Sequence, residues 1–175
     1  MQPVQPAGQE RTQLVQPEPE RTAVPAKPAK APAPDTSFLK GKPILLAEDN
    51  EINREIAAEL LKMYGAQVVQ AYNGREALEK FRESPPFTYA AILMDMQMPE
   101  MDGCEAAKAI RTLDRPDAKK VPIVAVTANA FAEDIAKTTA AGMDAHICKP
   151  IDFPSLFRLL SGLMEKEIAD NERAE

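Results

Sequence analysis

The chain has 175 residues, 45% of them hydrophobic and 27% charged, which is enough for one ordinary domain with a sizeable core. Its formal net charge of −6 argues against a nucleic-acid binder, because such proteins usually carry a basic face. Two widely separated cysteines, Cys104 and Cys148, form no metal-binding spacing and indicate a reduced, cytoplasmic protein. No apolar run approaches the roughly 18 residues of a membrane span, so no membrane contact is expected.

Residues 1–37 differ in composition from the rest of the chain, since they hold eight of the 16 prolines and no Phe, Tyr or Ile. Such a segment cannot bury enough apolar surface to offset the entropy of ordering it. We therefore predict a disordered linker rich in Pro, Ala and Gln, with a further domain attached before it. The remaining chain divides into a folded domain at 38–168 and a polar tail at 169–175.

From residue 38 onward, short apolar runs alternate with amphipathic stretches. The apolar runs predict strands at 44–47, 66–71, 90–94, 123–126 and 145–148. The amphipathic stretches predict helices at 52–63, 73–83, 102–113, 131–142 and 153–168. Five strand-then-helix units indicate an α/β domain with a parallel sheet and right-handed crossovers.

Several details of the sequence support these boundaries. In the first helix, Ile52, Ile56, Leu60 and Met63 follow helical spacing. Gly65 and Gly142 stand where helices should stop, and Pro116 and Pro122 bracket a loop. The apolar residues Phe131, Ile135, Phe153 and Phe157 are expected in the core, and the alternative is a contact in a weak homodimer.

Ionic and hydroxyl side chains follow four of the five predicted strands. The first strand precedes Glu48 and Asp49, the third Asp95, the fourth Thr127 and the fifth Lys149, whereas the second ends at Ala71 and Tyr72. Ligands of open parallel sheets bind in the crevice outside the carboxyl ends of the strands. We therefore expect these side chains to share one rim.

This combination of charges suggests a particular chemistry. Two unit charges about 4 Å apart in a partly wet site repel by about 4 kcal/mol, so three ionised carboxylates need a cation. Mg²⁺ suits few protein ligands and several waters. Thr127 and Lys149 could then hold the oxygens of a phosphoryl group, and Asp95 would be a nucleophile on a rigid strand.

Each of these residues also has an ordinary explanation when it is considered alone. Asp95 could be a turn residue, Lys149 a solvated loop charge, and the Glu48–Asp49 pair before Asn50 a helix start. These explanations do not account for the convergence of every ionic strand end on one rim. The joint pattern favours the functional interpretation.

With these residues in view, the chain from about Lys42 to Glu167 resembles the receiver domain of two-component response regulators. The resemblance rests on the acidic pair, on "LMDMQMPEMDG" around Asp95, on Thr127–Ala128 and on Lys149–Pro150. The stretches "EDNEINR", "MDMQMPEMDG" and "GMDAHICKPID" are most similar to receivers fused to sensor histidine kinases.

The resemblance implies a flavodoxin-like fold, with a doubly wound parallel sheet of strand order 2-1-3-4-5 and five helices. It implies that Asp95 accepts a phosphoryl group from a phosphohistidine on a histidine kinase domain or a histidine phosphotransfer protein. Mg²⁺ would be positioned by Glu48, Asp49, Asp95 and the backbone carbonyl of Gln97. Thr127 and Lys149 would bind the phosphoryl oxygens, in an in-line transfer that depends on positioning and electrostatics.

The resemblance also assigns roles in switching. The Lys149–Pro150 bond is expected to be cis. Thr127 would move toward the phosphate and repack the fourth helix, fifth strand and fifth helix. Its usual aromatic partner, three residues before the lysine, is here His146, the one histidine of the chain, for which a ring without a titrating role is the simpler interpretation. Gln97 and Asn129 flank the expected path of the attacking water and would tune the lifetime of the aspartyl phosphate.

Other classes of function fit less well. A haloacid-dehalogenase-like phosphatase needs a second Asp two residues after its nucleophile, and Gln97 stands there. Nucleotide-binding glycine motifs and GxSxG are absent from the sequence. A free single-domain regulator and a phosphorylation-independent interaction module remain as alternatives. Because the chain ends in the short polar "ADNERAE", we expect no DNA-binding output domain, and we expect a phosphoacceptor in a relay rather than a turnover enzyme.

Overall fold

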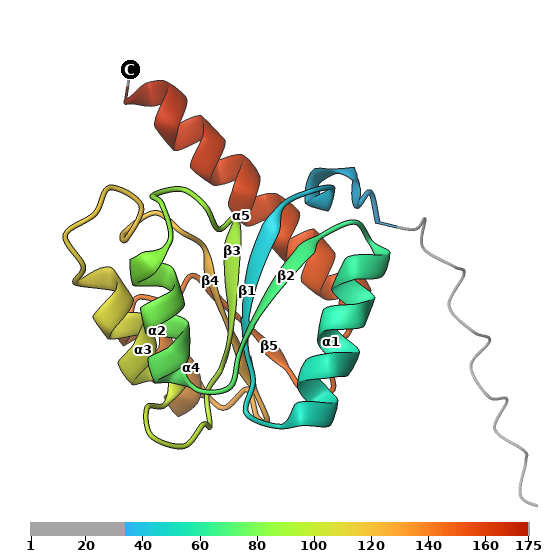
Figure 1. Ribbon diagram of the computed structural model, residues 1–175, viewed down its shortest axis with the longest axis vertical. Helices are drawn as coiled ribbons and strands as arrows, with labels where there is room; N and C mark the ends of the chain where they lie inside the picture. The colour runs from blue at the N-terminus through green and yellow to red at the C-terminus, as the bar shows by residue number, and fades with distance from the viewer. Residues whose placement is uncertain (1–33, 175) are drawn as a thin grey trace, which may run out of the picture. The chain divides into compact units, whose positions relative to one another are not determined.

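The computed structural model describes residues 34–174, which form a layered α/β domain (Figure 1). The linker predicted at 1–37 lies mostly outside the described residues. Its last residues, 34–37, lead into a 3-10 turn at Ser37–Leu39, where Leu39 is fully buried. None of the helices within 34–174 is long and apolar enough to cross a lipid bilayer.

Five parallel strands form a single sheet. The strands are β1 Pro43–Ala47, β2 Gln67–Ala71, β3 Ala91–Asp95, β4 Ile123–Thr127 and β5 Ala145–Cys148. They lie in the order β2-β1-β3-β4-β5, which confirms the predicted topology. Every residue of β3 and β4 is buried, as expected for central strands covered on both faces.

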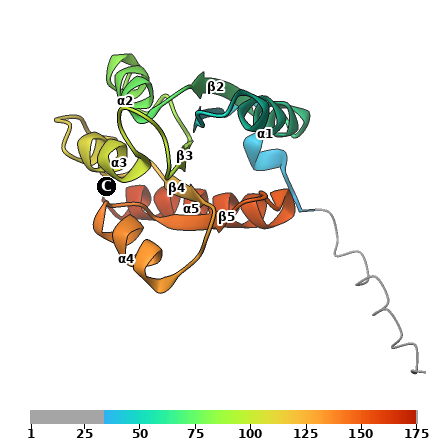
Figure 2. The ribbon, with the colours of Figure 1, turned by 90° about the horizontal axis from the view of Figure 1, so that it is seen from below.

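Helices cover both faces of this sheet. The helices are α1 Glu51–Met63, α2 Gly74–Glu83, α3 Gly103–Arg111, α4 Ala132–Ala140 and α5 Phe153–Arg173. Figure 2 shows α1 and α5 on one face and α2, α3 and α4 on the other. Alternate residues of β1 enter two separate cores, because Leu45 packs beneath α2 and α3 whereas Leu46 packs beneath α1 and α5.

Side chains just before the helices satisfy their free backbone amides. Asn50, Asn73, Asp102 and Asp152 each accept a hydrogen bond from the amide three residues later. Helix α4 follows Phe131 and has no side-chain cap of this kind. The chain leaves α1 and α4 through Gly65 and Gly142, whose φ angles are 95° and 84°, a conformation that favours glycine.

Helix α1 forms where the sequence predicted it, but its apolar stripe faces outward. Ile52, Ile56 and Met63 are 69%, 55% and 78% exposed. The residues that α1 buries are two alanines, one leucine and one arginine: Arg54, Ala57, Ala58 and Leu61. Burial in the core therefore does not explain the helical spacing of the stripe.

Two other expectations were wrong in part. Helix α5 continues to Arg173, so the domain does not end at residue 168 and most of the predicted tail at 169–175 is helical. Phe157 is fully buried as expected, and Ile135 and Phe153 are half-buried, but Phe131 is exposed. A phenylalanine at a helix start can leave the core when the following turn, as in α4, packs only lightly.

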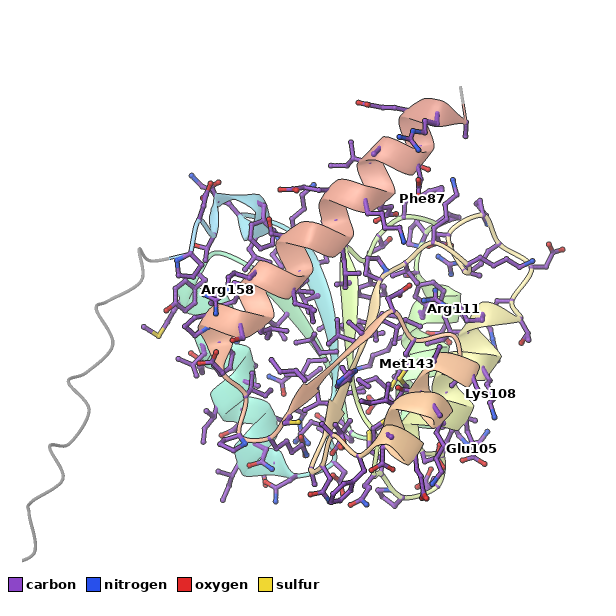
Figure 3. All side chains as sticks on the ribbon, turned by 180° about the vertical axis from the view of Figure 1, so that it is seen from behind. Phe87, Glu105, Lys108, Arg111, Met143 and Arg158 are labelled. Carbon is purple, nitrogen blue, oxygen red and sulfur yellow. The ribbon has the colours of Figure 1, made fainter. Side chains whose placement is uncertain are left out.

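Arg111 joins the end of α3 to two loops (labelled in Figure 3, near Met143). Its guanidinium donates to the carbonyl oxygens of Gly142, Ala118 and Val121 at 2.8, 2.9 and 2.8 Å. It also pairs with Asp144 at 2.8 Å. A single arginine thus satisfies several carbonyl groups of irregular backbone, which would otherwise be costly to bury.

The start of α3 lies directly against the end of β3, and a glycine makes this approach feasible. A Cβ atom on Gly103 would lie 2.3 Å from the backbone oxygen of Asp95, far inside van der Waals contact. The Gly103 amide donates to the Met96 carbonyl at 3.2 Å. The contact fixes the loop that follows Asp95.

We predict that Gly103→Ala lowers the free energy of unfolding by about 2 to 3 kcal/mol, because backbone atoms must move to admit the methyl group. Gly162→Ala is the matched control, since a Cβ there meets no atom within 4 Å. As a helix-interior exchange, it should raise stability by up to about 1 kcal/mol. Urea unfolding followed by circular dichroism measures both, and equal stabilities of the two variants would contradict the close approach.

Candidate functional site

The carboxyl ends of the five strands point to one edge of the sheet (Figure 1). At this edge, Glu48 and Asp95 are buried and Asp49 is exposed. One carboxylate oxygen from each of the three lies within 4.8 Å of the others. The rim predicted from the sequence therefore exists, with the three acids brought together by β1 and β3.

Lys149 supplies the positive charge for the two buried acids. Its ammonium lies 2.9 Å from Glu48 Oε2 and 2.9 Å from Asp95 Oδ2. Burial raises the pKa of Glu48, and the nearby charge of Asp95 adds to this although Lys149 opposes it. Burial alone would lower the pKa of Lys149, but its bonds to Asp95 and Glu48 outweigh burial and raise it. The lysine is thus held charged between two carboxylates.

Asp95 is held from both sides. It ends the fully buried strand β3, and the amide of Gln97 donates to its Oδ1 at 3.1 Å. The amide of Met96, the residue directly after Asp95, donates to the Val126 carbonyl of β4 at 3.0 Å. Its other oxygen, Oδ2, faces Lys149. The Asp95 carboxylate is thus fixed at the end of a buried strand by contacts on both of its oxygens.

Lys149 in turn is tied to the end of β4. Its amide donates to the Thr127 carbonyl at 2.7 Å, and the bond to Pro150 is cis. The hydroxyl of Thr127 donates to the carbonyl of Asn129 at 2.7 Å and accepts its amide at 3.2 Å. Thr127 and Asn129 therefore form a closed local turn at the rim.

His146 lies on β5, half-buried, opposite Ala125 of β4 in the strand register. Thr127 is paired with Cys148 in the same register. His146 and Thr127 thus occupy neighbouring strands near the rim, although they are not directly opposite each other.

The acidic cluster has the donors that a hard divalent cation needs. All three side chains offer carboxylate oxygens, and these converge within one coordination sphere. A cation there would offset their mutual repulsion, which Lys149 offsets only for Glu48 and Asp95. The residues present therefore fit Mg²⁺.

A cleft of about 590 Å³ opens beside the rim. Its lining combines apolar residues of α1, among them Ile56 and Leu60, with Lys149, Pro150 and Phe153. The exposed stripe of α1 and the charged rim therefore border the same hollow.

Arg54 was not among the residues predicted from the sequence, and no role was predicted for Tyr72. Arg54 is buried beneath the β1–α1 loop, and its guanidinium lies 4.2 Å from the centre of the Tyr72 ring. The sequence did contain one signal for Arg54, because this arginine lies near the start of the helix and outside its apolar stripe. An arginine that is buried at such a position needs partners for its charge.

Comparison with known proteins places this geometry in a family. The model of the response regulator receiver domain matches residues 44–161. Hybrid signal transduction histidine kinase L of Dictyostelium discoideum is 42% identical over 118 residues, which are 67% of this chain and 7% of that protein. The chain thus spans a small part of that kinase.

Two solved structures are similar to the domain. The receiver domain of sensor histidine kinase PA1611 from Pseudomonas aeruginosa PAO1, with a magnesium ion in its active-site cleft, is 34% identical with a TM-score of 0.64. The match covers 71% of this chain and 98% of that one. The Ssk1 receiver domain, co-crystallised with the histidine phosphotransfer protein Ypd1 of Saccharomyces cerevisiae, matches with 30% identity and a TM-score of 0.63. That match covers 70% of this chain and 88% of the other.

Fold, rim and comparisons agree: the chain belongs to the response regulator receiver domains of two-component systems and is homologous to the receivers of hybrid histidine kinases.

Proposed function

We propose that this domain takes a phosphoryl group from a phosphohistidine onto Asp95, as the receiver part of a hybrid histidine kinase in a phosphorelay. The main support is the position of Asp95, a buried strand-end carboxylate 2.9 Å from Lys149 and clustered with two further acids. Glu48, Asp49, Asp95 and the backbone carbonyl of Gln97 hold Mg²⁺ in this proposal. The PA1611 receiver, which carries magnesium in its cleft, is a homologous precedent.

In the transfer, an oxygen of Asp95 attacks phosphorus while the bond from phosphorus to the donor imidazole nitrogen breaks. The imidazole leaves with the electron pair of that bond, and the acyl phosphate forms on Asp95. Lys149 turns its ammonium to the phosphoryl oxygens, and the Thr127 hydroxyl leaves the carbonyl of Asn129 to donate to another of them. Bound Mg²⁺ supplies neutralisation of the charge on the phosphoryl group and the acids.

The phosphorylated state differs from the free one at the end of β4. Rotation of Thr127 opens its turn with Asn129, and we propose that His146 on β5 and helix α4 respond to this movement. In this proposal, Gln97 and Asn129 flank the path of the attacking water and tune the lifetime of the acyl phosphate. In the same proposal, residues 1–37 form a linker to the kinase part of a longer protein.

We predict that acetyl phosphate with Mg²⁺ adds the mass of one phosphoryl group to the protein, and that Asp95→Asn abolishes the adduct because an amide is no nucleophile here. Intact-mass spectrometry with and without EDTA measures it. Asp102→Asn is a control, since Asp102 caps α3 and lies outside the acidic cluster. An adduct that persists in Asp95→Asn would show that another residue is the nucleophile.

Lys149→Met should lower the free energy of unfolding by about 2 kcal/mol at pH 8 without Mg²⁺, because it leaves two buried carboxylates without their cation. The raised pKa of Lys149 means that its contribution is fully present below the pKa of the unfolded lysine. The contribution is lost in acid as Glu48, whose pKa is raised by burial, is protonated. Saturating Mg²⁺ should restore most of the lost stability.

Urea unfolding at pH 8 and pH 4 measures this effect. Lys62→Met is the matched control, because its ion pair with Glu59 on α1 is exposed and contributes little. A loss of stability in Lys149→Met that is the same at both pH values would argue against charge as its cause.

A donor histidine can reach Asp95 only if its protein covers the rim. We propose that a histidine kinase domain or a histidine phosphotransfer protein docks on the exposed apolar stripe of α1, as the Ssk1 receiver was co-crystallised with Ypd1. Ile52 and Ile56 lie on the turns of α1 nearest the rim, and Ile56 lines the cleft that Lys149 also lines. Exposed apolar side chains beside a polar centre are typical of docking surfaces.

Ile56→Asp should reduce phosphotransfer from a phosphorylated histidine phosphotransfer protein at least about 10-fold, since an interface charge without a partner costs more than 1.4 kcal/mol. Labelling by acetyl phosphate should not change. Met63→Asp is the control, because it is similarly exposed but lies about 10 Å further along α1. Equal losses in both variants, or a loss with acetyl phosphate, would contradict docking at the rim end of the helix.

A further inference from the structure

The β1–α1 loop, which carries two of the acids, is held by one buried arginine. Arg54 on the first turns of α1 donates from Nη1 to the carbonyl oxygen of Glu48 at 3.0 Å and to that of Asp49 at 3.3 Å. Its side chain is buried although it carries a permanent charge. Such burial is tolerated only where hydrogen bonds compensate the lost hydration.

These two carbonyl groups determine where the Asp49 side chain points. They belong to the two peptide planes on either side of the Asp49 Cα atom. Because peptide planes are rigid, fixing both carbonyl directions fixes the tetrahedral carbon between them and the direction of its Cβ bond. The Asp49 carboxylate is exposed, and none of the described residues donates a hydrogen bond to it. The direction of its Cβ bond, and with it the positions that the carboxylate can reach, therefore depends on the backbone.

The other side of the guanidinium is fixed by β2. Nε of Arg54 donates to Gln70 Oε1 at 3.3 Å, and the guanidinium stacks on the Tyr72 ring at 4.2 Å from its centre. A guanidinium presents its donors in a flat fork, and here the fork is clamped between the loop and the end of β2.

We propose that Arg54 is a positioning residue for the divalent cation: it sets the direction of the Asp49 carboxylate through the backbone of residues 48 and 49. The inference rests on the proposed function, since it assigns a role within the same Mg²⁺ site. Outer partners that orient metal ligands typically change metal affinity by about 10- to 100-fold when they are removed.

Charge and geometry make opposite predictions for this residue. Arg54 places a positive charge near a cation site, so removal of that charge alone should strengthen cation binding. Loss of the fork should weaken it. Arg54→Lys keeps the charge and loses the planar fork, whereas Arg54→Met loses both.

The test is calorimetric titration of the full chain with Mg²⁺ at pH 8, at a temperature where circular dichroism shows each variant folded. We expect Arg54→Lys to raise the Mg²⁺ Kd about 10-fold, the lower end of the range for outer partners. Arg54→Met should also raise it, but by less, because the loss of its charge partly offsets the loss of the fork. With acetyl phosphate, the Mg²⁺ concentration for half-maximal labelling should shift by the same factor. The maximal rate at saturating Mg²⁺ should stay near that of the unsubstituted protein, since Asp95 and Lys149 are untouched.

Arg111→Lys is the matched control. Arg111 also donates to backbone carbonyl oxygens, but those of Ala118, Val121 and Gly142, which belong to loops outside the acidic cluster. It should lower the melting temperature and leave the Mg²⁺ Kd unchanged. If Arg111→Lys raised the Kd as much as Arg54→Lys does, general loosening would be the cause and the proposal would fall.

Other outcomes also decide the matter. An unchanged Kd in Arg54→Lys, or tighter binding in Arg54→Met, would overturn the positioning role. If neither variant folds, Tyr72→Leu removes one side of the clamp at an exposed residue, and an unchanged Kd there would overturn the role as well. If the unsubstituted protein binds no Mg²⁺, the proposed function fails as well. If it binds Mg²⁺ and is labelled on Asp95 but the Arg54 variants have an unchanged Mg²⁺ Kd, only the positioning role of Arg54 is overturned.

Discussion

The repulsion between three carboxylates at the ends of β1 and β3 is the constraint on which the rest of the site depends. Two of these acids are buried, so water cannot screen them well, and Lys149 reaches both at 2.9 Å from the opposite side of the rim. Such a cluster survives only on a scaffold that prevents the carboxylates from moving apart. The buried strand β3, the glycine at the start of α3 and the arginine beneath the β1–α1 loop each remove one freedom of movement.

This rigidity is confined to the acidic half of the rim. Asp95 is held by the Gln97 amide and Lys149, and Asp49 is held through its backbone. The end of β4 is different, because the hydroxyl of Thr127 is engaged only in a local turn with Asn129. If Asp95 is the phosphoacceptor that we propose, a fixed carboxylate lies beside a side chain that can exchange one hydrogen bond for another, which is a suitable arrangement for a switch.

The sheet and its rim could be predicted from the sequence because both follow from local pattern. Continuous apolar runs require strands buried on two faces, and parallel connections place all their carboxyl ends at one edge. Asp95, Thr127 and Lys149 therefore had to converge once the strands were assigned. The choice of the buried face of α1 did not follow in this way. Ile52 and Ile56 obey the rule for a core-facing stripe, yet two alanines, Leu61 and Arg54 are the residues that α1 buries.

The partners of Arg54 could not be predicted either, although its place outside the apolar stripe of α1 was visible in the sequence. Its partners are backbone carbonyl groups, which every residue possesses, so no sequence pattern marks them. The end of α5 was equally hidden, since polar residues continue a helix as readily as they form a loop when no glycine or proline intervenes. In Figure 3 the C-terminal end of this helix projects beyond the rest of the domain. The residues of the site could thus be predicted from sequence pattern, whereas the residues that position them became apparent only in the structure.

The outward stripe of α1 has a consequence for how such a domain can change over time. Because Ile52, Ile56 and Met63 contribute little to the core, they can be replaced with little loss of folding free energy. The acids at the neighbouring rim allow no such latitude. The two faces of α1 therefore differ in how freely their residues can be substituted. The buried face supports the acidic site, whereas the exposed face can diverge after gene duplication. If partners dock there as we propose, duplicated domains can keep the same chemistry and yet bind different partners.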